Sequence, residues 1–116
     1  MNSTHALRIA ALFGFLAVAL GAFGAHGLKG TLELHGTAAI WQTAALYHLV
    51  HAVALLVLAQ REAPPRASYL LFVAGIVIFS GSLYLLAVTN VKWLGAITPL
   101  GGLSLLAGWA SLAFRR

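Results

Sequence analysis

Four long apolar stretches, separated by short polar segments, dominate the chain. They cover about residues 6–25, 37–60, 67–88 and 93–114. About 20 consecutive apolar residues is the length of helix that crosses the hydrocarbon core of a bilayer. Paired prolines at 64 and 65 stop the second stretch, and Pro99 predicts a kink or an unwound first turn in the fourth. The pattern predicts an all-α integral membrane protein, a four-helix bundle forming one domain over residues 1–116.

Composition supports this class and excludes others. Hydrophobic residues make up 61% of the chain and charged residues 8%, and the mean hydropathy is +0.94. A soluble domain has about 25% charged residues. The net charge of +5 comes from cations scattered at the ends of the apolar stretches rather than on one face, which does not favour a nucleic-acid partner. The chain has no cysteine, so disulfides and thiolate metal ligands are excluded.

The arginines predict the orientation in the membrane. An even number of spans puts both termini and the middle connection on one side. The cations on that side are Arg8, Arg61, Arg66, Arg115 and Arg116, and those on the other side are Lys29 and Lys92. Because cytoplasmic loops carry an excess of Lys and Arg, we expect both termini in the cytoplasm.

Small residues recur at spacings of three and four in the first and last stretches. The predicted packing residues are Gly14, Ala17, Gly21, Gly101, Ser104 and Gly108. Stripes of this kind let helix backbones approach closely in membranes. They are expected to pack the bundle, or to dock a second copy or another membrane protein.

Several polar side chains lie inside the apolar stretches, with His48 near the middle of the second stretch and His51 one turn later on nearly the same face. Ionisable residues at this depth are costly and usually face the interior of a bundle, where they are functional candidates. The second and third stretches run antiparallel from the turn at Pro64, so residues equally distant from this turn lie at the same depth. On this basis most polar groups lie between the midplane and the non-cytoplasmic face, and the inner half is predicted to be almost wholly apolar. The candidate site residues are His26, Gln42, Tyr47, His48, His51, Ser80, Ser82, Tyr84 and Thr98.

Each candidate also has a structural interpretation. The hydroxyl groups can bond to helix carbonyls, Tyr84 can be an interfacial aromatic residue, and the histidines can fix helix register. Haem needs a second deep histidine on a facing helix, and zinc needs three or four ligands. No serine–histidine–acid set or carboxylate pair is present, so we expect neither an enzyme nor a cofactor or metal.

Five motifs in order resemble the YgdD/YwdK family, also called domain of unknown function 423. They are Gly21-Ala22-Phe23-Gly24-Ala25-His26; Trp41-Gln42-Thr43 with Tyr47 and His51; Phe79-Ser80-Gly81-Ser82-Leu83-Tyr84; Thr98-Pro99-Leu100-Gly101-Gly102; and Gly108-Trp109. The resemblance implies a bacterial plasma (inner) membrane protein with four spans and no established role. It also implies histidine at the positions of His26 and His51 and a variable residue at His48, which favours His51 with Tyr47 as the site.

Two functions follow from these observations. The first is a small binding or transport module with a polar pocket in the outer half of the bundle. Its ligand would be a lipid, a quinone or a small solute, with His51 as a polar partner and the Tyr47 hydroxyl bonded to it. The second is an interaction protein that docks another membrane protein or its own copies, forming a homo-oligomer. In both cases the lipid bilayer is the first partner.

Overall fold

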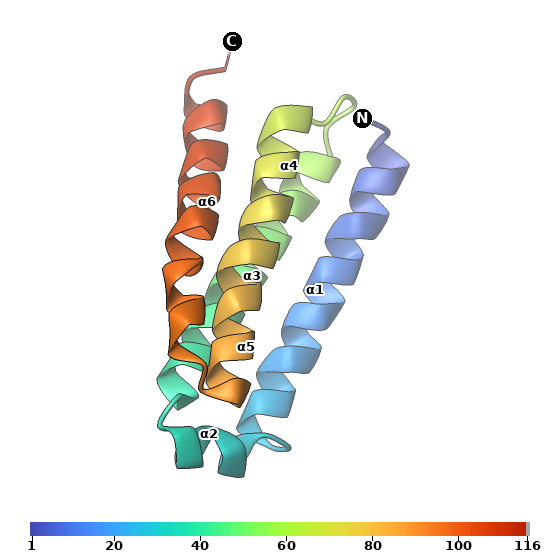
Figure 1. Ribbon diagram of the computed structural model, residues 1–116. Coiled ribbons are helices and arrows are strands. Elements are labelled where there is room, and N and C mark those ends of the chain that lie inside the picture. Colours follow the sequence, from blue (N-terminus) through green and yellow to red (C-terminus); the bar gives the residue numbers. More distant parts are fainter. Residues whose placement is uncertain (116) are drawn as a thin grey trace.

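The computed structural model describes residues 1–115 and is all-helical in that range (Figure 1). Its elements are α1 (Ser3–Ala25), α2 (Lys29–His35), α3 (Ala38–Ala59), α4 (Arg66–Gly75), the π-helix η1 (Ile76–Ser80), α5 (Gly81–Thr89), the 3₁₀-helix η2 (Lys92–Ala96) and α6 (Thr98–Ala113). Four continuous helical segments in this range are long and apolar enough to cross a bilayer: α1, α3, α4 to α5, and η2 to α6. The predicted four-helix membrane architecture is therefore confirmed.

Local sequence signals explain where the elements begin and end. The Asn2 side chain accepts hydrogen bonds from the backbone N–H groups of Thr4 and His5, at 2.7 and 3.3 Å. This N-cap starts α1 at Ser3, earlier than the apolar pattern alone indicates. The fourth span opens as a 3₁₀ turn and becomes α-helical at Thr98, with Pro99 in the first turn. The unwinding expected near Thr98 and Pro99 is present, because proline lacks the N–H of a helix interior.

The third span contains one π-helical turn that the sequence did not predict. Between Ile76 and Ser80 the helix widens, and the Gly81 N–H reaches back to the Ile76 carbonyl. A π-turn inserts one extra residue and turns the side chains after it to a new direction. Residues before and after η1 therefore face different neighbours than a regular α-helix would give them.

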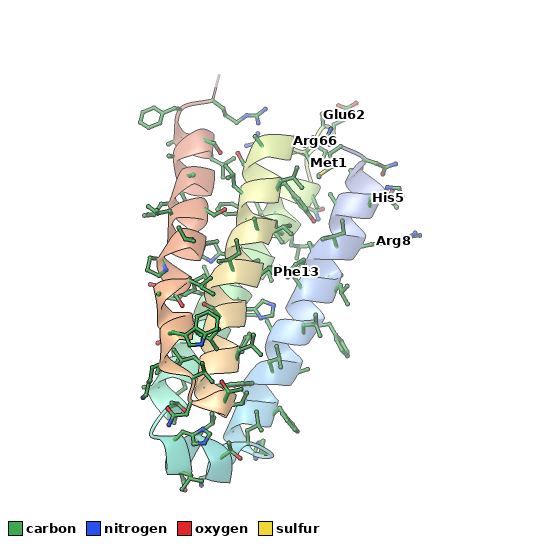
Figure 2. All side chains as sticks on the ribbon, viewed as in Figure 1. Met1, His5, Arg8, Phe13, Glu62 and Arg66 are labelled. Carbon is green, nitrogen blue, oxygen red and sulfur yellow. The ribbon has the colours of Figure 1, made fainter. Side chains whose placement is uncertain are left out.

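Both termini and the α3–α4 connection lie at one end of the bundle, and α2 lies across the other (Figure 1). We call these the terminal end and the α2 end. Figure 2 shows Met1, His5, Arg8, Glu62 and Arg66 gathered at the terminal end. Arg116 lies outside the described residues.

The four spans are not equivalent. The α3 span and the α4–α5 span are the more deeply buried pair. α1 packs chiefly against α3, and α6 packs chiefly against α4 and η1. Figure 1 shows α1 and α6 on opposite sides of this central pair. The main core cluster joins Ala6 and Ala10 to Leu55, Tyr69, Phe72 and Leu105.

The predicted packing residues of the last span lie at close contacts. A Cβ atom at Gly101 would clash with the backbone of Phe79, and one at Gly108 would lie 2.7 Å from the Phe72 ring. The Ser104 hydroxyl donates a 2.7 Å hydrogen bond to the Leu71 carbonyl. These three residues let α6 approach the third span closely.

The prediction for the first span is corrected in part. Ala17 is buried, but no atom lies within 4 Å of a Cβ built at Gly14 or Gly21. The buried small residues of α1 are instead Ala6, Ala10, Ala17 and Gly24. Gly14 and Gly21 are three residues before members of that row, about 60° around the helix. Small residues occupy two neighbouring rows along α1. Their spacing alone did not show which row packs against the other helices.

Candidate functional site

α3 carries both deep histidines, and the structure directs them to opposite sides of the bundle. Each side chain is only 4% exposed. Residues three apart differ by about 60° around a helix, which here is enough to separate them. His51 points toward α4 and α6, where its ring contacts Phe72 and Trp109. His48 points toward Phe13 of α1 and Tyr84 of α5. They form two separate polar sites, not one pair.

Both ring nitrogens of His51 have partners, and these partners fix its protonation. Nδ1 lies 2.7 Å from the Tyr47 main-chain carbonyl, and the Trp109 indole N–H donates to Nε2 at 3.0 Å. A carbonyl only accepts and an indole only donates. His51 is therefore neutral with its proton on Nδ1. The expected bond from the Tyr47 hydroxyl is absent, because the Tyr47 ring stacks parallel to the imidazole at a centroid distance of 6.2 Å.

Beside His51 a groove of about 560 Å³ runs between α3 and α6. The rings of Tyr47, Phe79 and Trp109 form part of its wall, and Tyr47 packs on Phe79 at 4.8 Å between ring centroids. The lining residues are Tyr47, His51, Phe79, Pro99, Gly102, Leu103, Leu105, Leu106 and Trp109. The lining residues cover positions 99–109 of the fourth span and 47–51 of α3, so the groove is centred near the middle of the bundle rather than in the half next to α2.

On the opposite side His48 pairs with Tyr84. Its Nδ1 lies 2.9 Å from the Tyr84 hydroxyl. Its Nε2 is the one buried side-chain polar atom within residues 1–115 that has no hydrogen-bond partner. The Tyr84 ring continues the contact toward Trp41, at 4.6 Å between ring centroids.

The other candidates are divided between internal contacts and the surface. Ser80 donates to the Ala44 carbonyl at 2.8 Å, and the Ser82 and Thr98 hydroxyls share a 2.6 Å hydrogen bond. These three tie the third span to its neighbours. His26 and Gln42 are exposed near the α2 end, away from both buried histidines. The nine candidates thus form no single site.

The half of the bundle next to the termini holds more polar contacts than the sequence predicted. The Tyr69 hydroxyl donates to the Ala6 carbonyl, and the hydroxyls of Ser68 and Ser111 share a hydrogen bond. The expectation of an almost wholly apolar inner half was therefore wrong. Helix-facing hydroxyls satisfy themselves on carbonyls of neighbouring spans, and the sequence does not show which serines face inward.

Trp109 is the functional candidate that sequence reasoning missed. Its indole holds His51 in one tautomer and forms part of the groove wall. One signal was available, since an indole N–H inside a bilayer needs an acceptor. No group of three or more His, Asp or Glu side chains converges as metal ligands within residues 1–115.

The fold and these contacts define a small integral membrane protein of four helical spans, with two separately buried histidines. The family model described as "Protein of unknown function (DUF423)" matches residues 20–102. The chain belongs to this family, as its motifs indicated.

Named relatives agree with this assignment. The chain is 45% identical to the UPF0382 membrane protein YwdK of Bacillus subtilis, over 87% of this chain and 86% of that protein. It is 44% identical to the UPF0382 inner membrane protein YgdD of Escherichia coli, over 95% of this chain and 87% of that protein. A relative from Haemophilus influenzae is 42% identical over 93% of this chain. No solved structure matches the chain.

Proposed function

We propose that this protein is a membrane-embedded binding protein for a lipid-like molecule, a lipid or a quinone, which enters the α3–α6 groove from the bilayer. The groove carries the proposal. Its volume of about 560 Å³ is within the range of small-molecule sites, which are mostly apolar with a few polar groups. Tyr47, at 42% exposure, lines this groove. His51 supports the groove wall and offers no free nitrogen.

Aromatic and aliphatic walls suit a flat or chain-like apolar body. Leu103 and Leu106 are both more than half exposed at the groove edge, so the opening faces the lipid and not water. A charged solute would lose its hydration in this groove without meeting a charged partner. Among the described residues, the groove also offers no charged side chain that could take part in a reaction. We therefore propose that the protein is not an enzyme.

Filling the groove tests this function. Leu103 and Leu100 are on the same helix and are each 62% exposed, but only Leu103 lines the groove. Leu103→Trp should block the groove and Leu100→Trp should not. The measurement is native mass spectrometry of protein reconstituted with dioleoyl phosphatidylglycerol or a short-chain prenyl benzoquinone. We expect Leu103→Trp to lose one equivalent of bound probe that Leu100→Trp retains. Equal retention by both variants would remove the proposal.

We further propose that the terminal end faces the cytoplasm of a bacterial cell and that the protein lies in the inner membrane, the location given in the name of the relative YgdD. Four described arginines at or near the terminal end, against two lysines at the α2 end, support this orientation. A cysteine replacing Glu33 in α2 should react with an impermeant thiol reagent in intact cells, whereas one replacing Glu62 should react only after lysis. The reverse pattern would invert the orientation.

A second candidate function is docking of another copy of the chain through α1. The observation that favours it is the open space at Gly14 and Gly21, which no residue of the same chain fills. Gly14→Leu with Gly21→Leu should then lower the copy number seen in native mass spectra. An unchanged copy number leaves α1 as a lipid-facing helix.

A further inference from the structure

His48 holds the buried polar atom that the packing does not satisfy. The side chain is 4% exposed, yet Nε2 has no hydrogen-bond partner within the described residues. The backbone of Phe13 approaches the ring, but outside hydrogen-bonding geometry with Nε2. A buried donor without an acceptor loses its bond to water and gains none in return, so its persistence calls for a partner.

The hydrogen bond with Tyr84 indicates which ring nitrogen of His48 carries the proton. Within the described residues, the Tyr84 hydroxyl has no hydrogen-bond partner apart from His48 Nδ1, at 2.9 Å. The hydroxyl has a single hydrogen to donate. If it donates to Nδ1, both of these atoms are satisfied, whereas the reverse direction leaves the hydroxyl hydrogen without an acceptor. This arrangement puts the imidazole proton on Nε2, which is then a free N–H donor.

A separate groove of about 210 Å³ lies at this ring, between α1 and the third span. Its side chains are apolar except for His48, Ser80 and Tyr84, and none is charged under neutral conditions. The Ser80 hydroxyl hydrogen is already bonded to the Ala44 carbonyl. The residues of η1 that line this groove, Ile76, Val77 and Ser80, belong to a π-turn, a feature frequent at functional sites.

We propose that this α1-side groove is a second binding site, in which His48 Nε2–H donates a hydrogen bond to the carbonyl oxygen of an uncharged, apolar molecule. Two sources supply this chemistry in a membrane: the ester carbonyl of a glycerolipid and the ring carbonyl of a quinone. A charged group is disfavoured because the groove offers no counter-charge. The site is distinct from the α3–α6 groove and does not depend on the function proposed for it.

Access to Nε2 requires the Phe13 side chain to move. Nε2 has no appreciable exposed surface, and the half-buried Phe13 ring stands edge-on to the imidazole at a centroid distance of 6.1 Å. Figure 2 shows Phe13 on α1, midway along the bundle. Phe13 lines the groove, and its ring makes no hydrogen bond, so in this proposal its rotation would expose Nε2 without breaking one.

The test measures binding of two probes to the full-length protein in nanodiscs: dioleoylglycerol, which carries esters and no charge, and a short-chain prenyl benzoquinone. His48→Phe keeps a ring and removes the donor, and should weaken binding at least tenfold. Phe13→Ala should strengthen binding several-fold by opening the groove. Leu100→Trp, which lines neither groove, should leave this binding unchanged.

A second readout does not depend on the variants folding equally well. Isotope-edited infrared spectra of ¹³C-carbonyl probes should show a shift to lower wavenumber in the wild-type protein, and this shift should be lost in His48→Phe. Whichever probe shifts identifies the source of the carbonyl. The proposal is overturned if neither probe shifts, or if Leu103→Trp abolishes binding while His48→Phe does not.

Discussion

The two flanking helices are attached to the central pair in different ways. On the α6 side, Gly101 and Gly108 bring backbone and ring into close contact, and the Trp109 indole completes the bonding of His51. On the α1 side, a Cβ atom at Gly14 or Gly21 would meet open space, and His48 keeps an unsatisfied nitrogen. Close backbone approach and complete hydrogen bonding fix α6 in place. The α1 side leaves both space and bonding capacity, which are the properties of a face that receives another molecule.

The largest expected effect is a clash on the α6 side. Gly101→Leu should cost at least about 3 kcal/mol of unfolding free energy, the upper end of overpacking, because the added side chain meets the Phe79 backbone. Gly14→Leu is the matched control and should change stability by no more than about 0.5 kcal/mol. Equilibrium unfolding in mixed micelles measures both. If the two variants lose the same stability, the contrast between the sides is absent.

The two histidine sites should differ in how much stability is lost when a polar group is removed. Trp109→Phe leaves a buried acceptor on His51 without its donor and should cost about 1–3 kcal/mol. His48→Phe removes a nitrogen that is already unsatisfied but leaves the half-buried Tyr84 hydroxyl without its partner, so the two effects offset and the variant should cost less than about 1 kcal/mol. The same unfolding assay compares them. A larger loss from His48→Phe would show that His48 is the structural residue.

The attachment of α1 should be visible in hydrogen exchange. The indole N–H of Trp41 donates to the Leu20 carbonyl at 2.9 Å, close to the α2 end. Trp41→Phe should cost about 0.5–1.5 kcal/mol and accelerate exchange in α1 while leaving α6 unchanged. Mass spectrometry of exchanged protein in detergent reports each helix separately. Equal acceleration in both helices would mean that the bundle opens as one cooperative unit.

The smallest expected losses of stability come from the hydroxyl hydrogen bonds between the third span and α6. Ser68→Ala and Ser82→Ala each remove one interhelical hydrogen bond, worth about 0.6 kcal/mol in a membrane. The two serines are 14 residues apart in one helical span, about 21 Å along its axis, so the double variant should lose the sum. A loss well above the sum would reveal coupling along the α6 side.

Much of the fold was predictable because hydropathy and length act locally. The four spans follow from apolar stretches long enough to cross a bilayer, and the turn at Pro64 and Pro65 follows from the chemistry of proline. The hydropathy pattern did not predict the π-turn at Ile76–Ser80. This turn contains Phe79, whose backbone lies close to Gly101 of α6, a contact between residues distant in the sequence.

The candidate site divides in the same way. The sequence identified His48, His51, Tyr47 and Tyr84 as notable, since polar groups inside a span need a reason. It did not separate the two histidines, and it did not identify Trp109 as the partner of His51. A rotation of about 60° between residues three apart is invisible to hydropathy when every face of the helix is apolar.

By itself, then, the sequence determined a protein of four membrane spans with polar groups at known depths, because the bilayer imposes length and apolarity on each span separately. Only the tertiary structure decided which side of α3 each histidine faces and which small residues are in contact. Those choices depend on helix rotation and interaxial distance, which are set by packing between spans whose surfaces are alike in hydropathy. The satisfied His51 and the unsatisfied His48 are the result of that packing.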